Sequence, residues 1–451
     1  MSQKPYNKYK DSGVEWLGEV PEHWGVKRLR FAMEMNPSKS EVSQTDLDGD
    51  VSFLPMEAVG ENGSLNLEFI RKYKDVQTGY TYFTNGDVTY AKITPCFENG
   101  KGALISGLLN GFGFGTTELT VMRPLEKTFG KYLWFVTKSD SFMSTGESTM
   151  YGAGGQKRVP DDFARNFHWA FPPLPEQQAI ANYLDRETAK IDTLVSEQKD
   201  LISLLKEKRQ ALISHTVTKG LAPNVKMKDS GVEWLGEVPE HWGVSRVKYI
   251  LKILTDFTAN GSFASLAENV TYLSEGYSRL VRLTDLRDNL DNDGLYISES
   301  AHNFLAKSEL FGGEVLLANV GAYAGFTCIM PKIDSKSTLG PNMFMMNFDG
   351  KFASNQFIQL ALSSPYAHEQ LLLSSTSTAQ PKLNKDDVKC VYLVIPPLPE
   401  QQAIATYLDH ETAKIDDLIA EAESAISLMQ ERRSALISAA VTGKIDVRGD
   451  A

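Results

Sequence analysis

Residues 172–220 read PPLPEQQAIANYLDRETAKIDTLVSEQKDLISLLKEKRQALISHTVTKG, and this stretch decides the fold. From Glu176 to Lys219 it contains neither Gly nor Pro. Its apolar residues recur at heptad spacing, which is typical of a helix with one apolar seam. The seam consists of Leu184, Ile191, Leu205 and Leu212, flanked by Leu194, Val195, Leu201 and Ile202. Glu176 suits the first turn, where the helix dipole is positive, and Gly220 suits the C-terminal end of the helix. At about 1.5 Å per residue the helix would be roughly 60 Å long, so its seam requires a partner.

The same chain supplies a second long helix. Residues 396–442 read PPLPEQQAIATYLDHETAKIDDLIAEAESAISLMQERRSALISAAVT. Its seam consists of Leu408, Ile415, Met429 and Leu436, flanked by Leu418, Ile419 and Ile426. Residues 172–192 and 396–416 differ only at Asn182/Thr406 and Arg186/His410. A duplicated pair of ordinary core helices would look the same over these stretches, so the rest of the chain must decide between the two interpretations.

A second duplication precedes the helices. Residues 10–26 read KDSGVEWLGEVPEHWGV, and residues 228–244 repeat them letter for letter. The chain is therefore two halves, each with a leader, a block, a Pro-rich hinge and a long helix. The predicted domains are a leader (1–24), a first block (25–171), a first long helix (172–220), a linker with the second leader (221–242), a second block (243–395), a second long helix (396–445) and a tail (446–451). Identical frameworks around different blocks indicate two equivalent framework tasks and two different block tasks.

The blocks show mixed helical and strand patterns. The strand-like runs are Val51–Leu54, Asp87–Ile93, Leu119–Arg123, Glu314–Val320 and Phe344–Phe348, and the short amphipathic helices are Phe129–Ser139 and Asn355–Ala361. Residues 86–92, GDVTYAK, correspond to residues 313–319, GEVLLAN. We predict an α/β (mixed α+β) chain, in which two globular domains are joined by two long antiparallel coiled-coil helices with a pseudo-two-fold internal repeat. Antiparallel packing is favoured because residues 221–228 are too few to return along a parallel helix.

Charge and hydropathy set wide bounds on function. The chain has 451 residues and a formal net charge of −11, but block 25–171 nets only −1 and block 243–395 only −2. A near-neutral domain can still present a basic face, so charge does not exclude nucleic acid.

No apolar run approaches the ~20 residues of a membrane span, and the N-terminus lacks the apolar core of a signal peptide. Three widely separated cysteines suit buried thiols, so a cytoplasmic protein with no membrane contact is expected.

Catalytic and cofactor motifs are not found. Phe171 begins a Phe-Pro-Pro-Leu run that superficially resembles the Asn/Asp-Pro-Pro-aromatic motif of amino-methyltransferases, but Phe171 and its copy Ile395 lack the polar side chain that holds the amine. The run GFGFG at 111–115 has no copy in the second block and fits a strand and turn better than a cofactor loop. The sequence has no Cys/His cluster of zinc spacing. We therefore expect no catalytic residue, no metal site and no cofactor.

Polar loops near the end of each block carry side chains suited to nucleic acid. Residues 152–163 read GAGGQKRVPDDF, and residues 374–388 read SSTSTAQPKLNKDDV. Gln can pair with adenine through two hydrogen bonds and Arg with guanine, while Lys suits guanine or phosphate. The DNA-binding candidates are Lys92, Gln156, Lys157 and Arg158 in the first block, and Ser377, Thr378, Gln380, Lys382, Asn384 and Lys385 in the second. A solvated surface loop is the plain alternative.

The duplicated motifs resemble those of type I restriction–modification specificity subunits. The residues that carry this resemblance are the two copies of DSGVEWLGEVPEHW, the two copies of PPLPEQQAIAxYLDxETAKID, and the helix ends ALIS (211–214 and 435–438) with Val217 and Val441. The resemblance covers the whole chain and implies that each block is a target recognition domain for one half of a split DNA site. It also implies a non-catalytic subunit whose long helices act as a spacer.

The resemblance further implies partners. These are double-stranded DNA, two copies of a methyltransferase subunit and, in the full complex, motor–nuclease subunits. Because the framework is duplicated, we expect it to hold the methyltransferases; the candidates are Trp16, Trp24, Gln177 and Gln178 in the first half, and Trp234, Trp242, Gln401 and Gln402 in the second. The alternatives are a stand-alone DNA methyltransferase with fused recognition domains, which would need the motifs not found, and a coiled-coil scaffold that binds no DNA.

Overall fold

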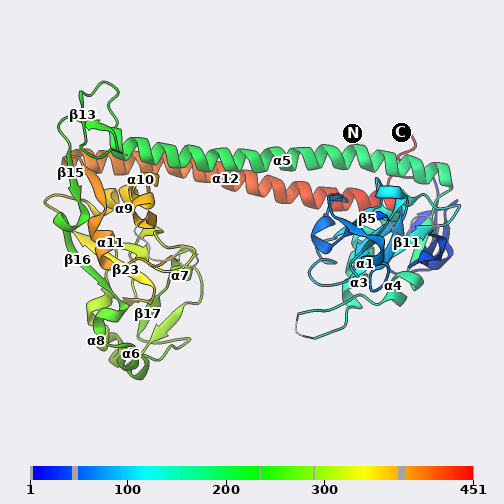
Figure 1. Cartoon of the computed structure of the whole chain (residues 1–451), viewed down its shortest axis with the longest axis horizontal. Coiled ribbons are helices and arrows are strands. Elements are labelled where there is room, and N and C mark those ends of the chain that lie inside the picture. The colour runs from blue at the N-terminus through cyan, green and yellow to red at the C-terminus, as the bar shows by residue number, and fades with distance from the viewer. Residues whose placement is uncertain are drawn as a thin grey trace. The chain divides into compact units, whose positions relative to one another are not determined.

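A computed structural model gives the structure of the chain and describes residues 4–42, 49–153, 155–233, 235–287, 290–373 and 381–449. The chain divides into two compact units. The first comprises residues 1–199 and 423–451, and the second residues 200–422. Each unit therefore contains one block together with parts of both long helices (Figure 1).

The two predicted long helices are present as α5 (Leu174–Lys219) and α12 (Leu398–Val441). Leu184 and Leu408 are fully buried at equivalent places on them. The expected flanks of the seam are partly wrong, because Leu194, Leu201 and Leu418 are exposed. These three side chains lie outside the packed stripe, so the seam is narrower than the count of apolar residues suggests.

Salt bridges give the direction of the helix pair. In the first unit Arg433 Nε lies 2.8 Å from Asp192 Oδ1, and in the second unit Arg209 Nε lies 2.9 Å from Asp416 Oδ1. Arg209 lies 17 residues after Asp192 on α5, whereas Asp416 lies 17 residues before Arg433 on α12. From the first ion pair to the second, the residue numbers rise along α5 and fall along α12, so the two helices run antiparallel, as predicted. Asp192 and Asp416 are copies of each other, as are Arg209 and Arg433, so each unit contains the same ion pair with the roles of the two helices exchanged.

Each block consists of two four-stranded sheets and short helices. In the first block the strand orders are β6-β5-β10-β7 and β4-β11-β8-β9. Their bounds are β4 (Met33–Met35), β5 (Asp50–Leu54), β6 (Ile70–Lys72), β7 (Thr81–Thr84), β8 (Val88–Ala91), β9 (Gly102–Leu104), β10 (Phe112–Gly115) and β11 (Leu119–Pro124). The helices are α1 (Tyr73–Val76), α2 (Gly130–Thr137), α3 (Asp140–Ser148) and α4 (Asp161–Asn166).

The second block has the same topology. Its orders are β18-β17-β22-β19 and β16-β23-β20-β21, and the pairs β5/β10 and β17/β22 are parallel in the two blocks. The bounds are β16 (Leu251–Asp256), β17 (Ser278–Val281), β18 (Leu295–Ile297), β19 (Glu309–Leu310), β20 (Val315–Ala318), β21 (Thr327–Ile329), β22 (Ser337–Leu339) and β23 (Met343–Phe348). The helices are α6 (Phe263–Asn269), α7 (Leu283–Arg287), α8 (Glu299–Phe304), α9 (Asn355–Ser363), α10 (Pro365–Leu373) and α11 (Lys385–Cys390). The two blocks therefore share one fold although their sequences differ.

Short paired strands frame each block. The leaders form hairpins from β1 (Tyr9–Asp11) with β2 (Glu19–Pro21), and from β13 (Met227–Asp229) with β14 (Glu237–Pro239). The first and last strands of each block then pair with each other. These are β3 (Gly25–Arg28) with β12 (His168–Phe171), and β15 (Gly243–Arg246) with β24 (Tyr392–Ile395). Each block is therefore a loop of chain that starts and ends at one place, beside the start of a long helix.

The expected strands and short helices of the blocks are confirmed. Strands β5, β8, β11, β20 and β23 and helices α2 and α9 fall on the predicted runs, and the GFGFG run contains strand β10. Gly220 ends α5 at a φ of +81°, as expected for a stop. The expectation of three buried thiols is wrong, because Cys390 is exposed and Cys96 and Cys328 are partly buried.

Candidate nucleic-acid interface

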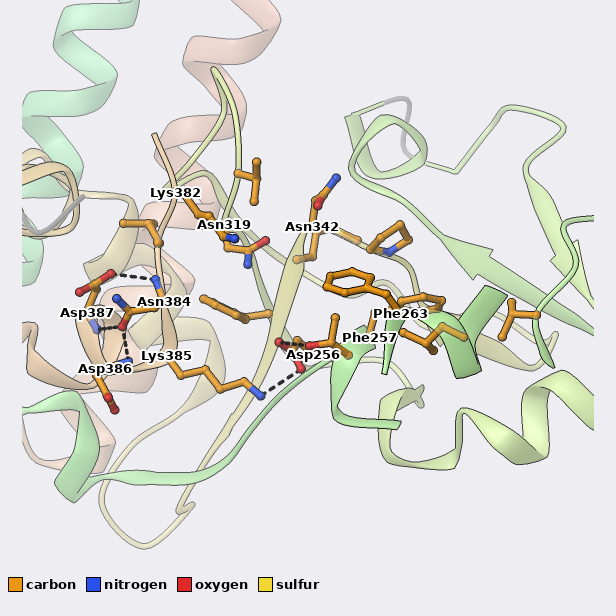
Figure 2. A pocket seen from close by; sticks show the side chains of 18 of the residues that line it. Asp256, Phe257, Phe263, Asn319, Asn342, Lys382, Asn384, Lys385, Asp386 and Asp387 are labelled. Atoms are coloured by element: carbon orange, nitrogen blue, oxygen red, sulfur yellow. Dashed lines mark hydrogen bonds and ion pairs between the residues drawn. The ribbon is translucent and has the colours of Figure 1, made fainter. Parts of the chain in front are cut away.

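In each block, the same strand ends surround a pocket. The second block has a pocket of about 1070 Å³ where β16 and β20 end and β23 begins (Figure 2). The first block has a pocket of about 440 Å³ where β4 and β8 end and β11 begins. These strands correspond in the shared topology. The two pockets are therefore equivalent sites with different linings.

The polar loop of the first block docks on the end of β8. Ile93 and Arg158 form a β-bridge, and the N–H of Val159 donates to the carbonyl of Lys92 at 2.8 Å. The Lys92 N–H donates to the carbonyl of Glu118, also at 2.8 Å. These bonds place Lys92, Glu118 and Arg158 at one edge of the sheet.

The second block repeats this backbone frame. Val320 and Lys382 form the β-bridge, and the N–H of Leu383 donates to the carbonyl of Asn319 at 2.8 Å. The Asn319 N–H donates to the carbonyl of Asn342 at 3.1 Å. Asn319, Asn342 and Lys382 thus stand where Lys92, Glu118 and Arg158 stand in the first block. The backbone is constant, and the side chains change.

The side chains of the first site are basic and partly paired. Arg158 binds Glu118 through two parallel contacts, Nε to Oε2 at 2.9 Å and Nη2 to Oε1 at 2.7 Å. This carboxylate raises the pKa of Arg158, so the guanidinium stays charged. Lys92 Nζ lies 3.9 Å from Asp161 Oδ1. Gln156 and Lys157 are exposed on the loop. The structure therefore brings all four candidates of the first block to one edge.

Three candidates of the second block line its pocket, and three lie outside the described residues. Lys382, Asn384 and Lys385 are lining residues, whereas Ser377, Thr378 and Gln380 fall in a stretch that the structure does not describe. Asn384 also has a structural task, because its side chain accepts from the N–H groups of Asp386 and Asp387 at 2.9 and 3.0 Å and caps α11. Lys385 Nζ binds Asp256 Oδ1 at 3.0 Å across the pocket wall.

Other lining residues were not predicted from the sequence. Asn319, Asn342, Phe263 and Tyr272 come from the end of β20, the turn before β23, helix α6 and the stretch after it. Phe263 is 81% exposed and Tyr272 is 49% exposed. The correspondence between residues 86–92 and 313–319 already aligned Lys92 with Asn319, and this was the signal that could have singled out Asn319.

Framework residues connect each leader to the start of its long helix. The Glu176 carboxylate at the start of α5 accepts from Trp24 Nε1 at 3.0 Å and from the Tyr6 hydroxyl at 2.7 Å, and it lies 2.7 Å from His23 Nε2. Burial and the Glu176 carboxylate raise the pKa of Tyr6. In the second half, Glu400 accepts from Trp242 Nε1 at 2.9 Å. These contacts explain why the leader and the helix start are duplicated together.

The first glutamine of each QQ pair holds the block to its helix. Gln177 Oε1 accepts from the Phe129 N–H at 2.8 Å, and its Nε2 donates to the carbonyls of Lys127 and Pro172 at 3.1 and 2.9 Å. Gln401 makes the same set, accepting from the Ser354 N–H at 2.8 Å and donating to two carbonyls. Both glutamines are buried.

The partner candidates therefore divide by exposure. The side chains of Trp24, Trp242, Gln177 and Gln401 are buried in internal contacts, so a surface for a partner has to be sought elsewhere. Gln178 and Gln402 are exposed next to them, and Trp16 is 39% exposed while stacking on Phe167 at a centroid distance of 4.6 Å. Trp234 lies outside the described residues. A docking role stays a prediction for the exposed members.

Two classes of site are not found in the described ranges. Within them, no group of three or more His, Cys, Asp or Glu residues is arranged to hold a metal ion. Over the same ranges, none of the helices is both long and apolar enough to span a membrane.

Comparison with known proteins gives the class of protein that the chain resembles. Residues 239–427 match the family model of the type I restriction modification DNA specificity domain. The matched part of the chain contains the second block and the first part of α12. More than half of the chain is similar to type I restriction enzyme specificity subunits, as the resemblance in its duplicated motifs predicted.

Three relatives are described as type I restriction enzyme specificity subunits. The EcoAI specificity subunit of Escherichia coli is 38% identical over 57% of this chain and 40% of its own length, and the EcoEI subunit of the same species is 35% identical with the same coverage. The chain thus spans about two fifths of the length of these two relatives. A putative MjaX specificity subunit of Methanocaldococcus jannaschii is 22% identical over 96% of both chains.

Two solved structures share the fold. A chain from a study of complex assembly and conformational transition in the type I R-M system matches with a TM-score of 0.72 at 16% identity, over 96% of this chain and 99% of that one. The HsdS subunit from Thermoanaerobacter tengcongensis matches with a TM-score of 0.52 at 16% identity, over 94% of this chain and 98% of that one. The predicted arrangement of two mixed domains on long helices is therefore a known fold.

Proposed function

We propose that this chain is the DNA sequence-specificity subunit of a type I restriction–modification complex. Each block reads one half of a bipartite double-stranded DNA site, and the chain itself carries out no chemistry. It acts in the cytoplasm, where methyltransferase and motor–nuclease subunits join it. One observation carries this proposal: the two blocks hold different side chains on the same backbone frame. A protein that must read two different half-sites requires such an arrangement.

The duplicated framework supports two equivalent docking surfaces. A leader of the same sequence lies beside the start of each long helix. The exposed Gln178 and Gln402 occupy equivalent positions on the two helix starts. A methyltransferase subunit that recognises one of these surfaces would also recognise the other. We infer a complex of one specificity chain with two methyltransferase chains, in which α5 and α12 set the distance between the half-sites.

The two rival functions have less support. A stand-alone methyltransferase would need a cofactor motif and a catalytic tetrapeptide, which the sequence does not contain. A coiled-coil scaffold without DNA would not need a pocket at the same strand ends of both blocks.

Co-purification followed by DNA binding tests the proposal. The full chain is expressed with the methyltransferase subunit of its own source, and native mass spectrometry measures the stoichiometry. We expect a complex of two methyltransferases and one specificity chain that methylates one bipartite motif in the host genome. A one-to-one complex at saturating methyltransferase would contradict the duplicated docking surface. A complex that methylates no defined motif would contradict DNA specificity.

A further inference from the structure

Asn319 lies at the centre of the pocket frame in the second block. It follows strand β20, and backbone hydrogen bonds to Asn342 and Leu383 fix it on both sides. Figure 2 shows its side chain in the pocket lining, between the labelled side chains of Lys382 and Asn342. Its side-chain oxygen Oδ1 is buried and has no hydrogen-bond partner in the described part of the chain. A buried acceptor without a partner costs free energy, so a ligand that supplies a donor would be favoured here.

The rest of the lining narrows the choice of ligand. Phe263 and Tyr272 expose aromatic faces, and the Asn342 side chain is exposed at the rim. Asn342 also holds a left-handed backbone with a φ of +65°, a conformation that is uncommon outside Gly and concentrated at functional sites. Aromatic faces together with amides suit a flat, polar-edged group such as a nucleobase. A purely apolar ligand would leave the Asn319 oxygen without a partner.

An amide and an amine select different bases. Asn forms two hydrogen bonds with the N6/N7 edge of adenine by accepting from N6 and donating to N7, whereas Lys donates only and suits the acceptors of guanine. The equivalent position in the first block is Lys92, which also lines its pocket. The two blocks therefore present different hydrogen-bonding groups at one structural position: Asn319 both accepts and donates, whereas Lys92 only donates.

We propose that Asn319 is a specificity-determining residue of the second block and reads an adenine in its half-site. The inference rests on the proposed function and deepens it by naming the residue and the base. Lys92 occupies the same position in the first block and reads a guanine. The backbone frame around this position is the same in both blocks, so a change of residue there would change the base that is read without moving the backbone.

Asn319→Asp tests the inference in the assembled methyltransferase complex. The substitution keeps the shape and the acceptors but removes the amide donor. Duplexes carrying each of the four base pairs at every position of the motif are compared for binding by fluorescence anisotropy. We expect wild type to prefer adenine at one position of one half-site, and Asn319→Asp to lose roughly 5- to 150-fold of that preference there. Asn303→Asp makes the same charge change at an exposed site on α8 of the same block and should leave every preference intact.

The outcomes separate this inference from the proposed function. If wild type has a defined bipartite motif and Asn319→Asp keeps every base preference, Asn319 does not read a base, although the proposed function stands. A uniform loss at all positions also overturns the inference, because it shows a general effect on binding or folding, which thermal denaturation of the variant would reveal. If wild type prefers no sequence, both the proposed function and this inference are wrong.

Discussion

At the scale of single residues, two adjacent glutamines at each helix start have different surroundings. Gln177 and Gln401 are buried and satisfy one N–H and two carbonyls each, whereas Gln178 and Gln402 face solvent. From the repeated sequence alone, the two glutamines of each pair cannot be told apart. Their structural environments predict opposite consequences for substitution.

Gln177→Ala and Gln401→Ala should each lower the free energy of unfolding by about 1–3 kcal/mol, because they leave buried backbone groups without partners. Gln178→Ala and Gln402→Ala are the matched controls and should change stability by less than about 0.5 kcal/mol. Denaturant titration measures stability, and native mass spectrometry measures methyltransferase binding. Weaker methyltransferase binding by the exposed pair alone would support the docking surface. Equal losses of stability for all four variants would contradict the structural division.

Arg158 is the second residue whose role can be measured. Arg158→Ala should weaken binding to the cognate site by about 1–3 kcal/mol if the guanidinium makes a bidentate base contact. The variant should lose its discrimination between bases only in the half-site that the first block reads, and it should discriminate bases in the other half-site as wild type does. Competition with altered duplexes measures this discrimination. Glu118→Gln is an informative companion, because it removes the charge that orients Arg158 while leaving the guanidinium in place. Unchanged binding after substitution of Gln156, Lys157 and Arg158 together would remove this loop from the interface.

At the scale of elements, the long helices show what heptad spacing can and cannot predict. It gave the two helices and their buried stripe, because an apolar side chain every seventh residue must face a partner. It did not distinguish Leu184, which is buried, from Leu194, which is 47% exposed, since both are leucines near the same stripe. The copy in α12 shows the same contrast between Leu408 and Leu418.

Leucine-to-alanine substitutions along α5 and α12 should follow burial rather than residue type. Leu184→Ala and Leu408→Ala should each cost about 2–4 kcal/mol of stability, because each leaves a cavity in a packed core. Leu194→Ala and Leu418→Ala should cost less than about 0.5 kcal/mol. Thermal and denaturant unfolding would measure all four variants. A large loss for the exposed pair would mean that the stripe is wider than the structure shows.

The blocks were less predictable than the helices. Their strands follow from alternating and continuous apolar runs, but the pairing of those strands depends on contacts between residues far apart in the sequence. The candidate loops were found because they are polar and precede each hinge. The pocket walls were not predicted because their residues come from stretches that are separated in the sequence, and no local pattern links Asp256, Phe263 and Asn342. Repetition also showed that Trp24 and Gln177 are constrained without showing that they face inward.

At the scale of the whole molecule, the helices should act as a ruler between the half-sites. Four residues inserted at Gln198 would lengthen α5 by ~6 Å, close to two base pairs of rise. A matching insertion is needed in α12, and the ion pair between Asp192 and Arg433 shows where. Gln198 lies six residues after Asp192 on α5, so the facing position on α12 is Ser427, six residues before Arg433. Because four residues slightly exceed one turn, both seams are nearly preserved.

The doubly inserted chain is expected to recognise the same two half-sites with a gap wider by one or two base pairs. Long-read sequencing of methylated bases in cells that express this variant would give the gap. Insertion of four residues in α5 alone is the control, since it disturbs the register of the pair. An unchanged gap in the doubly inserted chain would mean that the helices do not set the spacing.

The central claim is that two blocks of one fold read two half-sites independently, and a block exchange tests it most directly. Residues 25–171 can be replaced as a unit because β3 and β12 pair at their two ends, so the replacement starts and ends beside the same helix. The methylated motif of the exchanged chain is then mapped across the genome. The account predicts that one half of the motif changes while the other half and the gap stay as in wild type. A change in both halves would contradict it.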